Sequence, residues 1–383
     1  MQLLIKTFHG LEEVLAKEVK DLGGRNVVPL RRAISCEGDL KFLYNANHQL
    51  RTALKVLVPI TQFNARDESE LYKNTQQIDW SKYIQLNQTF AIDSVVFSST
   101  FKHSKYVALK VKDAIVDQFR DRTNRRPDVD TQFPDIRINV HIKDNEVSLS
   151  LDSSGESLHK RGYRHSGHPA PLNECLAAGM LILAGWEPSI PLIDPMCGTG
   201  TILIEAAMMA SNIAPGVKRK KYPFMNWKDF DKRLWMSVVK EGKEAEVVPS
   251  VSIKGGDIDS KSIDIAKMGS LDLGLGRFIS LEKIAFNSHH PKNKEGILIC
   301  NPPYGERIQP KDINALYKEI GDHLKANYTG FDAWILSSSK EAMKHIGLRS
   351  SKKIALYNGP LECKFQQFKV FEGRPKKKEK EST

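Results

Sequence analysis

The sequence predicts an α/β protein in which a parallel sheet, covered by helices on both faces, follows smaller α+β units. After residue 155, short apolar runs typical of buried strands alternate with helical segments, which is the pattern of a parallel sheet. Before residue 155, neighbouring strand-like runs stand close enough to pair as hairpins, which favours α+β units. The length of 383 residues suits two or three domains.

The first half of the chain contains two such units. Residues 2–62 follow the order strand, helix, strand, strand, helix, strand, which is the split βαβ order of a ferredoxin-like unit. Further on, two alternating runs are expected to pair across a short turn. The expected strands are 2–7, 27–30, 33–36, 53–60, 89–97, 135–142 and 147–151, and the expected helices are 11–23, 40–50 and 106–119.

A polar, basic connector at 156–168 leads into the second half. A helix is expected at 172–184, and helical segments separate the strands that follow it. The tail from residue 374 is charged and of low complexity, so we expect it to be disordered. The expected strands of the parallel sheet are 191–193, 251–254, 279–281, 296–300 and 333–336.

Composition excludes several classes of protein. Apolar residues make up 40% and charged residues 27%, which supplies a core and argues against wholesale disorder. The longest strongly apolar stretch, 176–186, is shorter than the about 20 residues that span a bilayer. The N-terminal residues lack the pattern of a signal peptide, so we expect a cytoplasmic protein without a membrane partner. The five cysteines form no CxxC pair and the eleven histidines show no ligand spacing, so we expect no metal.

The chain carries 57 basic and 46 acidic side chains, a net charge of +11, which indicates an acidic partner. Residues 1–155 hold 22 basic and 20 acidic side chains, so the excess lies mainly elsewhere, in local basic runs. Such a run is commonly only a solvated face, but nearby aromatic residues (Tyr163, Tyr222 and Phe224) favour nucleic acid, since phosphates attract cations and unstacked bases attract flat rings. The candidate contacts are Arg125, Arg126, Lys160, Arg161, Arg164, Lys218, Arg219, Lys220 and Lys221.

The first motif follows a short apolar strand, which ends in Asp194, passes a Gly198-Thr-Gly200 turn and enters an apolar helix. Glycines lack a Cβ, so a ligand can approach the backbone closely at the N-terminus of that helix. The third glycine of the dinucleotide fingerprint is replaced by Leu203. The motif therefore predicts a nucleotide-like ligand, with a simple strand-to-helix turn as the alternative.

The second motif, Gly-Gly-Asp257-Ile258-Asp259, again joins a strand to a helix. An acid in this position can accept hydrogen bonds from both hydroxyls of a ribose. The alternative is a helix N-cap, a role for which Asp259 is better placed. The two motifs are separated by an insertion that carries the basic run 218–221 and several aromatic residues.

The third motif is the most specific: a buried strand ends in Asn301-Pro302-Pro303-Tyr304. Two prolines fix φ and remove two backbone donors, which can aim the Asn301 amide oxygen and the carbonyl of Pro302 at one point. Two acceptors suit an amino group with two hydrogens, and the ring of Tyr304 can stack on a flat base. The alternative is an ordinary turn.

In this order, the three motifs resemble those of class I S-adenosylmethionine-dependent methyltransferases that act on exocyclic or amide nitrogens. Segments 112–120 and 151–164 look like those of THUMP-domain RNA methyltransferases, and residues 1 to about 371 resemble the bacterial large-subunit ribosomal RNA guanine-N2 methyltransferases of the RlmL type. The resemblance implies a Rossmann-like class I methyltransferase domain preceded by ferredoxin-like and THUMP α+β modules. The implied ranges are 1–62 (ferredoxin-like), 63–157 (THUMP, RNA-binding), 158–373 (methyltransferase) and 374–383 (basic tail).

The resemblance also implies roles for individual residues. Asn301, Pro302, Pro303 and Tyr304 would hold the target base. The position before Phe286, where many relatives carry an acid, is Ala285, and the turn at 171–173 would close over the methionine end of the cofactor. The residues implied to bind S-adenosylmethionine are Asp194, Met196, Cys197, Gly198, Gly200, Asp257, Ile258, Phe286 and Asn301.

The expected reaction is methyl transfer from S-adenosylmethionine to the N2 amine of a guanine in large-subunit ribosomal RNA. A guanine in folded RNA must be unstacked to reach such a pocket. One alternative is a transfer-RNA guanine-N2 methyltransferase, and others are a DNA adenine-N6 or a protein glutamine methyltransferase, which share the third motif. A further alternative, a non-catalytic RNA-binding or ribosome assembly factor, would be indicated by broken motifs, but the motifs are intact. No oligomeric state is assigned.

Overall fold

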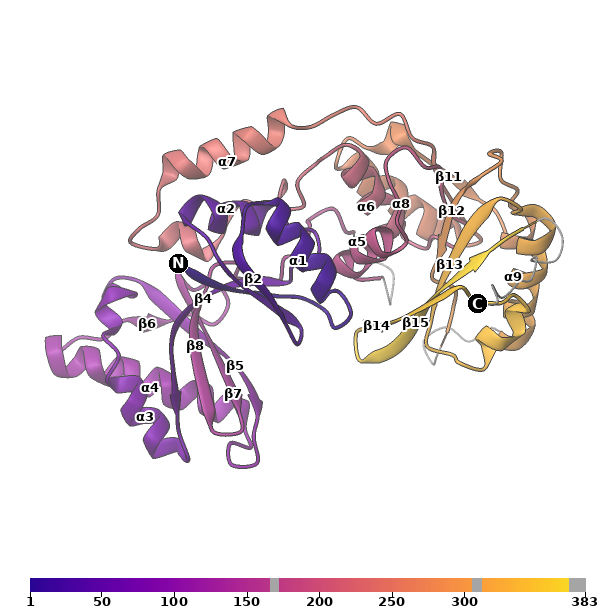
Figure 1. The fold of residues 1–383 in the computed structure, drawn as a ribbon. Coiled ribbons are helices and arrows are strands. Elements are labelled where there is room, and N and C mark those ends of the chain that lie inside the picture. Colours follow the sequence, from indigo (N-terminus) through magenta and orange to yellow (C-terminus); the bar gives the residue numbers. More distant parts are fainter. Residues whose placement is uncertain (166–171, 305–311, 372–383) are drawn as a thin grey trace, which may run out of the picture. The chain divides into compact units, whose positions relative to one another are not determined.

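The computed structural model describes residues 1–165, 172–304 and 312–371 (Figure 1). Their contacts divide the chain into two units. The N-terminal unit consists of Met1–Thr7, Leu15–Leu158 and Gly216–Glu241. The C-terminal unit consists of Phe8–Val14 and of the described residues of 159–215 and from 242 onward. Among the described residues, no helix is both long and apolar enough to cross a membrane.

An eight-stranded sheet with the order β2-β3-β1-β4-β8-β7-β5-β6 forms the framework of the N-terminal unit. The expected ferredoxin-like order is confirmed, since β1, α1, β2, β3, α2 and β4 follow one another along the chain. The strands are β1 (Gln2–Lys6), β2 (Arg25–Leu30), β3 (Ala33–Glu37), β4 (Lys55–Asn64), β5 (Thr89–Phe97), β6 (Asp128–Val129), β7 (Ile136–Lys143) and β8 (Glu146–Asp152). The helices are α1 (Glu12–Asp21), α2 (Leu40–Gln49), α3 (Glu68–Gln76) and α4 (Ser104–Thr123).

One long strand joins the two α+β modules into this single sheet. Strand β4 pairs with β1 near its start, through Val56 and Leu57, and with β8 from Leu57 to Asn64, with one irregularity between Pro59 and Thr61. Strands β7 and β8 pair antiparallel as the sequence predicts, and Asp144 in the turn between them has a φ of 54°. A φ in this range is tolerated by Asp and Asn better than by most residues.

The insertion between the first two motifs folds into the N-terminal unit. Phe224 stacks between Tyr44 and Tyr222, with ring centroids 4.7 and 4.9 Å apart, and the edge of Trp235 closes the cluster. The Arg219 guanidinium donates to the carbonyl oxygens of Ser154, Glu156 and Ser157 at 2.9 Å. Trp235 lies on α7 (Lys232–Glu244). The insertion thus contributes to the core of this unit.

A seven-stranded sheet with the order β11-β10-β9-β12-β13-β15-β14 forms the framework of the C-terminal unit. The first five strands in this order are parallel, as the sequence predicts, but β15 pairs antiparallel with both β13 and β14. Strands joined by a tight turn can only pair antiparallel. The strands are β9 (Leu192–Asp194), β10 (Ile253–Asp257), β11 (Ile279–Lys283), β12 (Gly296–Cys300), β13 (Phe331–Ser337), β14 (Lys352–Asn358) and β15 (Leu361–Lys369).

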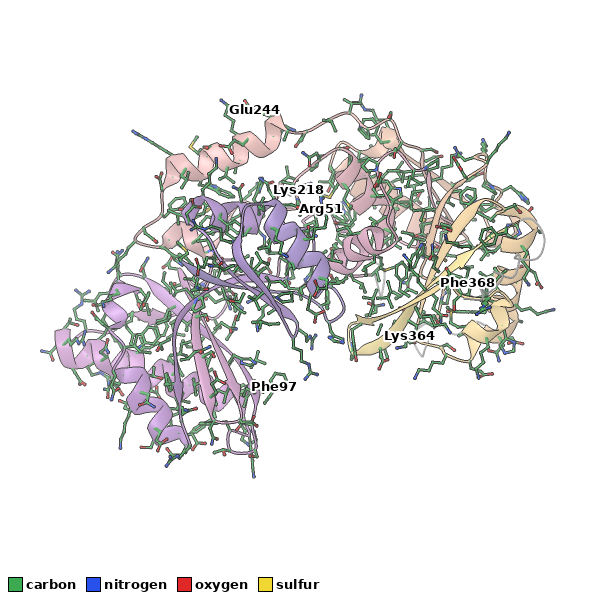
Figure 2. All side chains as sticks on the ribbon, viewed as in Figure 1. Arg51, Phe97, Lys218, Glu244, Lys364 and Phe368 are labelled. Atoms are coloured by element: carbon green, nitrogen blue, oxygen red, sulfur yellow. The ribbon has the colours of Figure 1, made fainter. Side chains whose placement is uncertain are left out.

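Helices cover both faces of this sheet. Along β12, Ile297 and Ile299 belong to the core with α5, α6 and α8, whereas Leu298 and Cys300 belong to the core with α9. Alternate residues of a strand face opposite sides, so a strand buried on both faces is a continuous apolar run. Phe368, labelled in Figure 2, belongs to the α9 side. The helices are α5 (Glu174–Leu183), α6 (Thr201–Ala210), α8 (Ser260–Leu271) and α9 (Ile313–Asn327).

We predict that Phe224→Ala destabilises the N-terminal unit by about 3–5 kcal/mol, because it removes a fully buried aromatic ring from the centre of a cluster. Urea unfolding followed by tryptophan fluorescence measures this, since Trp235 contacts the deleted ring. The control is Met236→Ala on α7, next to Trp235, where the side chain is 60% exposed and the expected change is about 0.5 kcal/mol or less. Equal losses for both variants would contradict the packing described.

Candidate active site

The three sequence motifs meet at one edge of the C-terminal sheet. Strand β9 is flanked by β10 and β12, and all three run parallel. Their carboxyl ends therefore converge, which brings together Asp194, Asp257 and Asn301 around a pocket of about 580 Å³. Of the residues expected to bind the cofactor, those lining the pocket are Asp194, Met196, Cys197, Gly198, Asp257, Ile258, Phe286 and Asn301.

The first motif forms a glycine turn between β9 and α6. Gly198 and Gly200 have φ values of 51° and 77°, in the left-handed region that favours glycine. The amide of Gly200 donates to the carbonyl of Cys197 at 2.8 Å, which closes the turn. A Cβ on Gly200 would lie 2.8 Å from the Cβ of Ala266 on α8, whereas a Cβ on Gly198 would meet no heavy atom of the described residues within 4 Å. Gly200 is therefore needed for helix packing, and Gly198 borders open space.

The second motif ties this turn to β10. One carboxylate oxygen of Asp257 accepts the Gly198 amide at 2.8 Å, and the other accepts the Asp259 amide at 2.9 Å. Asp259 caps α8 by accepting the amide of Ser262 at 3.1 Å, as the sequence predicts. A carboxylate offers about four lone-pair sites, so Asp257 keeps acceptor capacity for hydroxyl groups of a ligand.

The electrostatics of the pocket favour a cationic ligand. Asp194 is 1% exposed, and burial, together with the nearby Asp257 carboxylate, raises its pKa well above the usual range despite a hydrogen bond from the Met196 amide. Burial also raises the pKa of the Cys197 thiol, so this group is not a nucleophile at neutral pH. A positively charged group in the pocket would relieve the repulsion between the two carboxylates.

The third motif directs an unused acceptor into the pocket wall. The Asn301 side-chain oxygen is buried and forms no hydrogen bond with the described residues. A buried acceptor without a donor costs about 1–3 kcal/mol, which a ligand N–H would recover. Tyr304 also lines the pocket, and its hydroxyl accepts a hydrogen bond from the Asn358 amide at 2.9 Å.

Sequence reasoning missed several residues that line the same pocket. Asn287 donates to a Glu319 carboxylate oxygen at 2.7 Å, and both side chains reach the pocket, from the segment after β11 and from α9. Their positions carry no recognisable motif, and only the fold brings them to the edge where the motifs meet. The other missed residues include Leu316, Asn358, Pro360 and Leu361.

One of the predicted nucleic-acid contacts in the connector, Arg161, needs correction. Arg161 is 2% exposed and pairs with Glu205, 3.4 Å from its Nε, and the hydroxyl of Tyr163 donates to the same carboxylate at 3.0 Å. Arg164 donates to the carbonyl of Leu172 at 2.6 Å and pairs with Glu174 at 3.1 Å. Arg161 is therefore inaccessible to an RNA phosphate, whereas Arg164 is paired but still exposed.

The insertion requires the same correction. Arg219 is held by backbone carbonyls, and Tyr163, Tyr222 and Phe224 are buried, so none of these rings can stack on a base. Part of the turn at 171–173 lies outside the described residues. The tail from 374 lies outside them entirely. The candidates that remain exposed are Arg125, Arg126, Lys160, Arg164, Lys218, Lys220 and Lys221.

Of the two histidines at 289–290, His290 is exposed and His289 belongs to a hydrogen-bonded core cluster. The ring of His289 lies 2.7 Å from the hydroxyl of Tyr328, and the ring of His323 donates to the carbonyl of His289 at 2.8 Å. Phe286, which lines the pocket, packs edge-on against His323 at 5.0 Å. Over residues 1–165, 172–304 and 312–371, no group of three His, Cys, Asp or Glu side chains is arranged to hold a metal ion.

Comparisons with known families cover most of the chain. Residues 161–367 match the RMKL-like methyltransferase domain. Residues 65–152 match the THUMP domain, and residues 2–57 match the RlmL ferredoxin-like domain.

Two curated relatives illustrate the range of lengths. A Synechocystis protein provisionally named an RNA methyltransferase is 41% identical over 364 residues, which cover 94% of this chain and 95% of the relative. The ribosomal RNA large subunit methyltransferase K/L of Syntrophotalea carbinolica is 38% identical over 378 residues, which cover 95% of this chain and 53% of the relative. This chain therefore spans about half the length of the K/L relatives.

Solved structures share the whole fold. The crystal structure of SMU.472, provisionally named a methyltransferase and complexed with S-adenosylhomocysteine (SAH), is 29% identical with a TM-score of 0.88, and the match covers 97% of this chain and 99% of that one. A Listeria monocytogenes protein titled a predicted N6-adenine-specific DNA methylase is 31% identical with a TM-score of 0.86, and the match covers 96% of both chains.

We predict opposite defects for the two glycines of the first motif. Gly198→Ala adds a methyl group at the open pocket wall, so SAH affinity should fall by about tenfold or more, with about 1–2 kcal/mol of backbone strain. Gly200→Ala forces a Cβ against Ala266 and should mainly lower the thermal unfolding temperature. Calorimetric SAH titrations and thermal melts separate the two effects. A loss of affinity without a loss of stability in Gly200→Ala would contradict these assignments.

We predict that Glu174 makes stability pH-dependent. Burial raises the pKa of Glu174 from 4.5 to about 7, an effect that exceeds the opposing pull of Arg164. A raised carboxyl pKa contributes stability below about pH 4.5, and this contribution is lost as the pH rises through about 7. Between pH 5 and pH 8, Glu174→Gln should therefore gain about 1–3 kcal/mol relative to the wild type.

Urea unfolding at the two pH values measures this gain. Glu187→Gln, at an exposed position of the same unit, is the control and should leave the pH dependence unchanged. A Glu174→Gln variant with the same pH dependence as the wild type would show that the carboxyl does not titrate in this range.

Proposed function

The chain belongs to the RMKL-like methyltransferase family, with THUMP and RlmL ferredoxin-like domains, and on this premise we propose that it methylates the exocyclic N2 amine of a guanine in large-subunit ribosomal RNA. S-adenosylmethionine is the cofactor. The observation that carries the proposal is the buried Asn301 oxygen at the end of β12, an acceptor to which none of the described residues donates. The relatives named K/L support ribosomal RNA as the substrate.

The pocket fits the cofactor in charge and shape. S-adenosylmethionine carries a sulfonium and an ammonium, which suit a pocket containing two carboxylates. The glycine turn leaves open space at Gly198, where the methionine part would lie, and Asp257 keeps acceptor capacity for the ribose hydroxyls. Ala285 stands where many relatives carry an acid. Glu319, which is hydrogen-bonded to Asn287, would supply a carboxylate for the adenine amine instead.

When bound, the cofactor supplies an activated methyl group, so the protein has to position and desolvate the target amine. The lone pair of that amine is delocalised into the base. Hydrogen bonds from its two N–H groups to the Asn301 side-chain oxygen and the carbonyl of Pro302 would favour the pyramidal, nucleophilic form. The two prolines hold these acceptors in place without conformational freedom of their own. No strong base is required, because the amine protons become acidic as the new bond forms.

The N-terminal unit would bind the RNA by recognising the shape and the phosphates of the RNA, as expected of a THUMP domain. Deleting residues 1–155 is a poor test of this role. The aromatic cluster of the insertion packs against Tyr44 of that region, so the deletion would expose Phe224 and Trp235. Charge reversal at exposed positions, such as Arg125 and Arg126, tests RNA binding in the intact chain.

Three alternatives predict different outcomes of one assay. A transfer-RNA enzyme would form N2-methylguanosine in transfer RNA, and a DNA enzyme, as the Listeria relative is titled, would form N6-methyladenine. A non-catalytic assembly factor would form neither. Incubating the protein with tritiated S-adenosylmethionine and each nucleic acid, followed by digestion to nucleosides, distinguishes all of them.

We predict that Asn301→Ala lowers methyl transfer by about 10²–10³-fold, because it removes a preorganised acceptor from the reacting amine. RNA affinity should stay within a few-fold of the wild type, since phosphate contacts dominate it. Single-turnover transfer and filter binding measure the two quantities. Asn301→Asp, which keeps an acceptor oxygen, is the matched control and should retain more activity than Asn301→Ala. Unchanged turnover in Asn301→Ala would refute the assignment.

A further inference from the structure

The hairpin of β14 and β15 contributes a wall of the pocket that none of the three motifs supplies. Asn358 ends β14, Leu361 begins β15, and the two residues pair across the turn at Gly359 and Pro360. Asn358, Pro360 and Leu361 all line the pocket. Leu361 is 41% exposed, so this wall is formed by a solvent-accessible apolar side chain beside a polar one.

Two side chains of this hairpin hold the hydroxyl of Tyr304. The Asn358 amide donates to it at 2.9 Å, and the thiol of Cys363 donates to it at 3.7 Å. Cys363 is fully buried on β15 and pairs in register with Leu356, so it cannot move independently of the sheet. The ring of Tyr304 is therefore fixed at both ends, by the backbone after Pro303 and by the hairpin at its hydroxyl.

The hydroxyl itself is unsuited to proton transfer. Burial raises the pKa of Tyr304 well above that of free tyrosine, so the phenol stays protonated at any physiological pH. Its hydrogen bonds therefore set the orientation of the ring. A ring that must stack on an incoming base benefits from being held in place before the base arrives, since the entropy of ordering is then not lost on binding.

We propose that Asn358 is a positioning residue, which holds the Tyr304 ring as the stacking surface for an unstacked RNA base, with Cys363 as a weaker second contact. This inference rests on the proposed function in so far as the third motif takes a flat base. It adds that the recognition of the base depends on a hairpin that lies far along the chain from the glycine turn.

A double-mutant cycle tests the inference in the full-length protein. Asn358→Leu removes the donor at similar volume, and Tyr304→Phe removes the hydroxyl but keeps the ring. Each should lower kcat/KM for RNA by about three- to tenfold, the effect of one hydrogen bond, chiefly through KM. SAH affinity should change by less than twofold. The double variant should be no worse than either single variant, because both remove the same interaction.

The matched control lies at the other end of the same hairpin. Ser351 donates to the Gln367 side chain at 2.9 Å, so Ser351→Ala loosens the hairpin without touching the pocket. This variant should keep the wild-type kcat/KM. If Asn358→Leu does not fold, as judged by its thermal melt, Asn358→Ser replaces it, because a serine hydroxyl is too short to span the 2.9 Å contact made by the longer amide.

Three outcomes would overturn the inference. Additive losses in the double variant would mean that Asn358 does not act through Tyr304. Wild-type kinetics in both single variants would mean that the ring needs no support, and an equal loss in Ser351→Ala would mean that general loosening of the hairpin is responsible. Failure of the proposed function is recognised separately, because Asn301→Ala would then retain full transfer whatever the Asn358 variants do.

Discussion

The order of the strands around β9 is the constraint on which the rest of the site depends. In the sheet, β9 lies between β10 and β12. After β9 the chain first places a strand on one side of it and later one on the other side, so the carboxyl ends of the three parallel strands lie at the same edge. Asp194, Asp257 and Asn301 are far apart along the chain and share a pocket only because of this reversal. The hydrogen bond from the Gly198 amide to the Asp257 carboxylate then ties the glycine turn to the neighbouring strand.

Much of this could be predicted from the sequence, because the determining signals are local. A strand ending in Asp before Gly-x-Gly, or in Asn before two prolines, fixes the backbone direction within a few residues. The apolar run 296–300 indicates a strand buried on both faces, and the structure confirms it with helices on both sides. Asp259 was recognisable as a helix cap for the same local reason.

Features that depend on distant contacts could not be predicted in this way. Charge counting treated Arg161 and Arg219 as surface cations, but each is used inside the fold, by Glu205 and by backbone carbonyls respectively. Burial of a cation depends on a partner elsewhere in the chain, and no local pattern shows that partner. For the same reason, no local pattern in the insertion predicts that its aromatic residues pack on Tyr44. The hairpin that supports Tyr304 likewise contains no recognisable motif. The net charge of +11 is thus a property of the composition and not a map of the RNA surface.

The central claim is that this pocket methylates a guanine amine in ribosomal RNA. The most direct measurement is mass spectrometry of nucleosides from purified large-subunit ribosomal RNA and transfer RNA of a strain that lacks the gene, complemented with either the wild type or Asn301→Ala. We predict that N2-methylguanosine decreases in the ribosomal RNA alone, and that only the wild type restores it. A decrease confined to transfer RNA, a loss of a different nucleoside, or restoration by Asn301→Ala would contradict it.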